Sequence, residues 1–241
     1  MSVELLAMRI HPLAFVAAVC TVSATAQFHI VPVLDAAENP RDLNRDPEFS
    51  IYMIDSGWVQ HLDQNATDAW TPPIALPFPV AFNGSSFTSF QANQSGVLTF
   101  TPNPWVQPAE TNYALPSAQL PNNSVCVWGL YFNHGGSGLY TKTFGTTPHR
   151  QFWATWCFAS SDDISFTYWS IAFEETTGHI YIADQKTGGA PDVTSLTVGV
   201  QVNATEAYQV PTSPNVANVT GAAYNVDFAD NGYYVIKPGT T

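Results

Sequence analysis

Short apolar segments alternate with turn residues along most of the chain. The segments are rich in Val, Ile, Phe, Tyr and Trp, and Gly, Pro, Asn and Asp separate them, which is typical of strands joined by tight turns. In Ile164–Phe173, apolar residues mostly alternate with small or polar ones, as in a strand with one buried face. Residues Glu174–Gly178 then lead into the apolar segment His179–Ala183, which predicts a hairpin. Strands are expected at Phe49–Ile54, Pro79–Phe82, Ser86–Ala92, Val97–Thr101, Val125–Asn133, Gly138–Phe144, Gln151–Ala159, Ile164–Phe173, His179–Asp184, Ser195–Asn203, Ala222–Phe228 and Tyr233–Ile236.

This pattern predicts an all-β fold. No segment after the N-terminal region carries convincing helical periodicity, and about a dozen short antiparallel strands indicate a single β-sandwich, jelly-roll-like, over residues 49–241. Residues 27–48 are less regular and are expected to form an N-terminal extension or arm, which can complete a neighbour's sheet by β-augmentation. Residues 101–123 form a long loop rich in Pro, Asn and Gln, and loops of this length often carry function.

The first 26 residues have the parts of a secretory signal peptide. Arg9 precedes the apolar run Leu13–Val22, and the small-residue site Ala24-Thr25-Ala26 follows it. The run is too short to span a bilayer, and no second run of spanning length follows. We therefore expect a protein that is secreted, or displayed at the cell surface, with a mature chain that starts near Gln27.

Composition narrows the classes of function. The chain carries 19 acidic and 7 basic side chains, a net charge of −12, which excludes electrostatic capture of nucleic acid or of an anionic membrane. Hydrophobic residues are 45% of the chain and charged residues only 11%. That balance argues for a folded core rather than disorder, and for weak repulsion between neighbouring copies.

Two cysteines remain after the predicted cleavage site. In an oxidising compartment an even number favours a disulfide, here between Cys126 and Cys157. The alternative is a pair of buried thiols, because both cysteines lie inside apolar runs. Sequons are also more frequent than chance predicts, and several are expected to carry glycans if the source is eukaryotic. They are Asn65, Asn83, Asn93, Asn122, Asn203 and Asn218.

The strand pattern between Ile74 and Val202 resembles the nidogen-like (NIDO) domain of nidogen, tectorin and related extracellular proteins. It is also similar to sandwich modules of bacterial surface proteins. The resemblance is carried by Leu76–Gly84, Gln94–Phe100, Trp128–Tyr140, Phe152–Trp156, Phe166–Tyr181 and Val198–Val200. Ser95 stands where the family usually has a turn Asn, and Asn133 where members often have an acidic residue. The resemblance implies extracellular adhesion or matrix assembly and no catalytic apparatus.

Candidate chemistry is sparse. Glycoside hydrolysis needs two carboxyl groups facing one cleft, and the consecutive Glu174 and Glu175 would point to opposite faces of a strand. The histidines lack zinc-binding spacing, and no nucleophile elbow is present. No catalytic residue, metal site or cofactor is therefore expected. Ca²⁺ at strand-end aspartates is left as an open alternative, because such loops often bind it in secreted sandwiches.

Aromatic residues in polar loops are the candidate binding residues. Trp70, Trp105 and Tyr113 lie in loops rich in Pro, and exposed aromatic rings anchor protein interfaces or stack on sugars. We expect a non-enzymatic structural or adhesive protein that associates with itself, as an oligomer or filament, or with other extracellular proteins. The alternative is a carbohydrate-binding module that uses the same residues. A secreted glycoside hydrolase with the Glu174–Glu175 pair is a third hypothesis.

Overall fold

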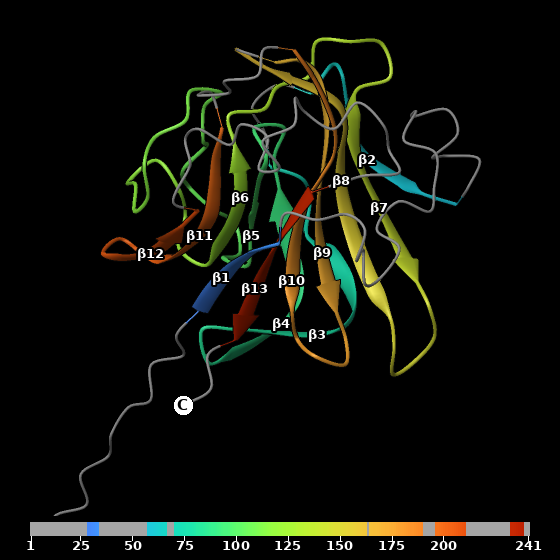
Figure 1. The fold of residues 1–241 in the computed structure, drawn as a ribbon, viewed down its shortest axis with the longest axis vertical. Helices are drawn as coiled ribbons and strands as arrows, with labels where there is room; N and C mark the ends of the chain where they lie inside the picture. The colour runs from blue at the N-terminus through green and yellow to red at the C-terminus, as the bar shows by residue number, and fades with distance from the viewer. Residues whose placement is uncertain are drawn as a thin grey trace, which may run out of the picture.

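The computed structural model describes residues 28–33, 57–66, 70–162, 164–189, 196–210 and 232–238, with the backbone alone for residues 28–33, 164–165, 184–189, 232–234 and 238. These residues form two antiparallel sheets that pack face to face (Figure 1). The predicted signal peptide, the strands expected at Phe49–Ile54 and Ala222–Phe228, and the sequon Asn218 lie outside the described residues.

One sheet has six strands in the order β12-β11-β6-β5-β4-β3. Its strands are β3 (Ile74–Phe82), β4 (Ser85–Ala92), β5 (Val97–Thr99), β6 (Ser124–Trp128), β11 (Thr197–Asn203) and β12 (Glu206–Gln209). Gly96 makes the turn into β5 possible, because it has φ +82° and a Cβ there would lie 1.9 Å from the Val127 carbonyl oxygen.

The other sheet has seven strands in the order β1-β13-β10-β9-β8-β7-β2. Its strands are β1 (Phe28–Val33), β2 (Val59–Asp63), β7 (Gly138–Phe144), β8 (Gln151–Ser161), β9 (Ile164–Glu174), β10 (Ile180–Gly189) and β13 (Gly232–Pro238). The hairpin predicted after β9 is present, with Ile180 opposite Phe173.

These sheets confirm the predicted β-sandwich of about a dozen short antiparallel strands. Strands β3 to β6 follow one another within the six-stranded sheet, and β7 to β10 within the seven-stranded sheet. Each run is a meander, whereas a jelly roll is built from two Greek keys. The chain then crosses back to the six-stranded sheet for β11 and β12, and crosses again for β13.

The main core lies between the sheets. In β3, buried and more exposed positions alternate from Ile74 to Phe82, as expected of an edge strand with one face on a core. The Phe90 ring of the six-stranded sheet contacts two rings of the other sheet. It meets Phe152 edge to face, with ring centroids 5.9 Å apart, and Phe173 at a tilt, with centroids 6.3 Å apart. Such aromatic contacts join the two layers by direct packing.

Both outer faces of the sandwich are also covered. In β6, Val125 and Val127 belong to the main core, whereas Cys126 and Trp128 belong to a separate cluster with Val97 and Leu120. In β8, Trp153 and Cys157 belong to a third cluster, on the far side of the seven-stranded sheet. Because both faces are buried, β6 and β8 read as nearly continuous apolar runs rather than as alternating ones.

The predicted Cys126–Cys157 disulfide is wrong. No bond joins the two thiols, and each is buried in a cluster on a different outer face of the sandwich. Packed sheets lie about 10 Å apart, and side chains that point outward from both are farther apart still. A disulfide requires Cβ atoms about 4 Å apart, so this fold cannot form the bridge.

The boundary predicted between arm and sandwich also needs correction. Residues 28–33, expected in a separate extension, form β1 at the edge of the seven-stranded sheet, where they pair with β13. Figure 1 shows β1, in blue, beside the red β13. The sandwich therefore includes part of the predicted arm. Phe28 pairs with Pro238 and Val33 with Tyr233, a contact between the two ends of the chain that local patterns do not encode.

Candidate functional site

The chain between β5 and β6, residues 100–123, covers the outer face of the six-stranded sheet. We call it the β5–β6 loop; its green trace lies beside β6 and β11 in Figure 1. Two indole groups hold its first half, because Trp70 Nε1 donates to the Val106 carbonyl and Trp128 Nε1 to the Ala109 carbonyl, both at 2.7 Å. Trp70, which the sequence analysis gives as a candidate binding residue, therefore supports this loop, as Trp128 of β6 does.

The turn before β5 provides a further anchor. The Pro108 carbonyl accepts from Asn93 Nδ2 at 3.3 Å and from Ser95 Oγ at 3.0 Å. Asn93 Oδ1 also accepts from the backbone N–H of Val97 at 3.2 Å, so this fully buried amide joins the turn to the loop. The Ser95 hydroxyl, at the position where the sequence departs from the NIDO pattern, has a structural role here.

Side chains of β11 and β12 hold the second half of the loop. Gln201 accepts from Ser117 N at 2.7 Å and donates to the Ser117 and Leu120 carbonyls, each at 2.9 Å. Gln209 accepts from Leu115 N at 2.7 Å. Hydrogen bonds to the sheet beneath thus fix the backbone of the loop along its length, although the loop contains no helix or strand of its own.

Trp105 and Tyr113 are the large apolar side chains that this ordered loop exposes. Trp105 is 90% exposed and Tyr113 is 51% exposed. The Tyr113 ring lies against the Trp128 ring, with centroids 5.6 Å apart. Trp70, the third predicted binding residue, is partly buried and packs against the cluster under the loop. The structure therefore brings the three predicted residues to one loop, two on its surface and one supporting it.

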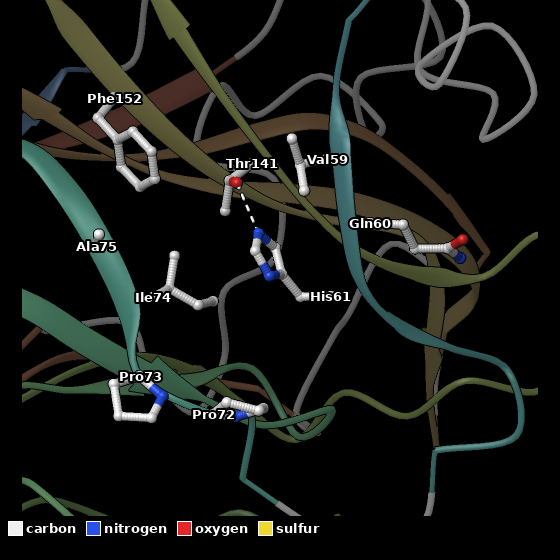
Figure 2. Close-up of a pocket in the computed structure, with 9 residues that line it drawn as sticks. All are labelled: Val59, Gln60, His61, Pro72, Pro73, Ile74, Ala75, Thr141 and Phe152. Carbon is white, nitrogen blue, oxygen red and sulfur yellow. Dashed lines mark hydrogen bonds between the residues drawn. The ribbon is translucent and has the colours of Figure 1, made fainter.

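A groove about 490 Å³ in volume lies at the opposite side of the sandwich, between the edge strands β2 and β3. Figure 2 shows His61 projecting from β2 toward Thr141 and Ile74, with Pro72 and Pro73 forming the facing wall. His61 Nε2 is 2.8 Å from Thr141 Oγ1. The sequence predicts His61 only as a loop or surface histidine, because β2 is short and has no strongly buried face.

His61 is the one titratable side chain among the described residues that line the groove. Burial lowers the pKa of its imidazole below the usual value. The His61 imidazole contacts the Thr141 hydroxyl, and none of the described lining residues carries a carboxylate that could orient the ring for catalysis. The groove is a surface depression whose wall contains the His61–Thr141 hydrogen bond.

The two glutamates proposed as a catalytic pair have separate structural partners. Glu174 is buried, and its carboxylate accepts from the hydroxyls of Thr177 and Tyr181. Glu175 receives two hydrogen bonds from Arg150, from Nε at 2.8 Å and from Nη2 at 2.6 Å. The bidentate contact with Arg150 lowers the pKa of the Glu175 carboxyl. Such partners fix a turn rather than leave a pair of carboxyl groups facing a cleft.

Metal ligands do not gather in the described part of the chain. No group of three or more His, Cys, Asp or Glu side chains there is arranged to hold an ion. Several aspartates considered for Ca²⁺, including Asp163, Asp192 and Asp230, lie outside the described residues. Asn133, which replaces the family's acidic residue, accepts a hydrogen bond from Ser160 Oγ at 2.8 Å.

The sequons differ in accessibility. Asn65, Asn83 and Asn122 are exposed, and Asn203 is partly exposed at the turn between β11 and β12. Asn93, however, is fully buried, and its side-chain amide is used on both sides by hydrogen bonds. We therefore expect Asn93 to carry no glycan in the folded protein, because a glycan there would displace the β5–β6 loop.

The two packed sheets and the β5–β6 loop form an all-β sandwich module that exposes two large aromatic side chains on one ordered loop. The NIDO related family model matches residues 52–236, more than three quarters of the chain, and the protein belongs to that family. The family is one of extracellular, non-enzymatic structural modules. No curated protein and no solved structure matches the chain. No helix in the described residues has the length and hydrophobicity that a membrane crossing needs.

Proposed function

We propose that this protein is a secreted, non-enzymatic structural or adhesive module that associates with copies of itself or with other extracellular proteins through the β5–β6 loop. Trp105 carries the proposal: its side chain is 90% exposed on a loop whose backbone is hydrogen-bonded to the sheet beneath. A tryptophan held out into solvent by ordered backbone is the kind of residue that dominates protein interfaces.

Energetic considerations support this role. Burying a tryptophan side chain removes roughly 150–250 Å² from water, which at about 25 cal/mol per Å² is worth roughly 4–6 kcal/mol before the costs of association. Because the loop is already ordered in the free protein, binding requires little further loss of backbone entropy.

A carbohydrate-binding module is the second candidate function. Trp105 and Tyr113 are both exposed on the same loop, and aromatic rings on an ordered surface also stack on sugar rings. The two functions use the same residues, but they differ in the state of the protein. A self-associating module forms oligomers or filaments on its own, whereas a glycan-binding module stays monomeric until it meets its ligand.

The test compares the secreted protein with Trp105→Ala by light scattering after size exclusion and by negative-stain electron microscopy. We expect the wild-type protein to form oligomers, fibres or sheets and Trp105→Ala to be monomeric with an unchanged melting temperature. Val59→Ala is the matched control, because Val59 is also exposed, at 56%, but lies on β2. This control should assemble like the wild type.

Two results would count against the proposal. Assembly that Trp105→Ala leaves unchanged would show that the loop is not the contact. A wild-type protein that is monomeric at every concentration, with binding on a glycan array that Trp105→Ala abolishes, would instead establish the carbohydrate-binding function.

A further inference from the structure

Among the strands that the structure describes, β1 has a single sheet neighbour, β13. It pairs with β13 in six consecutive residue pairs, from Phe28 opposite Pro238 to Val33 opposite Tyr233, and its other edge is the end of the seven-stranded sheet. The family match begins at residue 52 and ends at residue 236. Strand β1 is therefore an addition outside the matched residues, laid against the strand that ends the module.

Strand β13 needs this partner. Val235 and Ile236 are 5% and 1% exposed, and β10 pairs with β13 on its inner side. Without β1, the outer side of β13 would be an open edge of an apolar strand, which is a template for pairing with another chain. The position that β1 occupies is thus a strand-binding site as well as a part of the fold.

The chain that connects β1 to β2 is long enough for β1 to reach another molecule. Residues 34–58 separate the two strands, and this stretch can reach about 80 Å when fully extended. A sandwich of this size has a radius of gyration of roughly 17 Å. The connection therefore spans more than the width of the domain, and it does not require β1 to pair within its own chain.

We propose that β1 of one copy pairs with β13 of a second copy, in the register that it has within one chain, so that strand exchange joins the copies. This inference rests on the proposed self-association and names the strand that one copy gives and the edge that the other receives. Reciprocal exchange closes a dimer, whereas sequential exchange, in which each copy gives its strand to the next, builds an open filament.

The two pairings make the same hydrogen bonds, so their balance depends on concentration. Covalent attachment through a connection of this length gives β1 an effective concentration on the order of mM at its own β13. Pairing within one chain therefore wins in dilute solution. Exchange becomes populated where copies are already held together, as contact through Trp105 would do.

A cysteine pair across the two strands tests the exchange. His29 lies opposite Lys237 in the observed register, and cross-strand neighbours have Cβ atoms about 5 Å apart, close enough for a disulfide after small shifts. We would mix two single variants, His29→Cys with an added tag and Lys237→Cys without one. Incubation under assembly conditions is followed by mild oxidation, and peptide mapping then identifies the crosslink.

We expect a disulfide between the two chains at positions 29 and 237. The matched control mixes His29→Cys with Tyr233→Cys, whose partner in the register is Val33, and should give no crosslink. In the double variant His29→Cys/Lys237→Cys, an oxidised bond within one chain should prevent exchange, and reductant should restore it. Absence of the crosslink in a mixture that does assemble would overturn the exchange.

The outcomes separate the two proposals. If assembly persists in the oxidised double variant and is lost in Trp105→Ala, the loop contact stands and strand exchange fails. If Trp105→Ala leaves assembly intact while the 29–237 crosslink forms between chains, strand exchange stands and the proposed role of the loop fails. Both proposals are overturned if the wild-type protein is monomeric and the mixed cysteine variants give no crosslink between chains.

Discussion

The anchor of the β5–β6 loop at the Pro108 carbonyl can be tested by a double-mutant cycle. Asn93→Ala removes one donor to this carbonyl and also the acceptor of the Val97 N–H, whereas Ser95→Ala removes the other donor. Each single variant leaves the carbonyl with one hydrogen bond. The double variant leaves a buried carbonyl with neither donor.

The magnitudes follow from counting these bonds. At roughly 1 kcal/mol for each lost hydrogen bond, we expect Asn93→Ala to lower the free energy of unfolding by about 2 kcal/mol and Ser95→Ala by about 1 kcal/mol. An unsatisfied buried carbonyl costs a further 1–3 kcal/mol or so. The double variant should therefore be destabilised by about 4–6 kcal/mol, more than the sum of the singles.

Urea unfolding followed by tryptophan fluorescence measures this coupling, and thermal melts check it. For a chain of this size, 1 kcal/mol corresponds to roughly 2–4 °C in Tm. Neighbouring residues that share a partner couple by about 0.5–3 kcal/mol, whereas independent sites add to within about 0.3–0.5 kcal/mol. Additivity within 0.3 kcal/mol or so would refute the shared anchor at Pro108.

Three further predictions concern single residues. In the non-reduced mature protein, the thiols of Cys126 and Cys157 should both react with Ellman's reagent in denaturant. Neither should react in the folded state, because both are buried and burial raises the pKa of Cys126 to about 12. Finding no reactive thiol in denaturant would contradict the fold. Burial lowers the pKa of His61 in the folded state below 6.5. Below about that pH the unfolded chain therefore binds more protons than the folded one, and the free energy of unfolding falls on acidification. The urea midpoint of His61→Gln should fall less than that of the wild type between about pH 7.5 and 5, and equal falls would argue against this. In material secreted by a eukaryotic host, glycopeptide mapping should find Asn93 unmodified and Asn83 occupied; a glycan on Asn93 would be incompatible with the buried amide.

Local sequence patterns were sufficient for the strands that have a well-defined turn at each end. The strand predicted at Gly138–Phe144 is observed with the same bounds, and that predicted at Ile164–Phe173 extends by one residue. Strands β2 and β12 were missed because they lack a fully buried face. Alternation is the signal of a half-buried strand, and edge strands without it resemble loops.

Other errors arose where the two faces of a strand could not be distinguished. Cys126 and Cys157 lie in runs buried on both sides, so the sequence gives no sign that they face opposite ways out of the sandwich. Asn93 reads as a surface sequon, but its amide has the geometry to satisfy a buried turn. Strand β1 has its partner at the far end of the chain, and such long-range pairing has no local signature.

The arrangement of the sandwich edges links the loop surface to the exchangeable strand. At one side of the molecule β12 ends the six-stranded sheet, and β1, which ends the other sheet, contacts it. The β5–β6 loop reaches the same strand through the bond from Leu115 N to Gln209. The other side, between β2 and β3, holds the groove with His61 and presents neither the loop nor β1.

A second copy that docks on the loop near β12 would therefore approach the position of β1, where pairing with β13 can pass from one chain to the next. In the proposed assembly, the aromatic contact would raise the local concentration of copies. The exchanged strand would then make the contact durable, because it would add a complete ladder of backbone hydrogen bonds between the two chains.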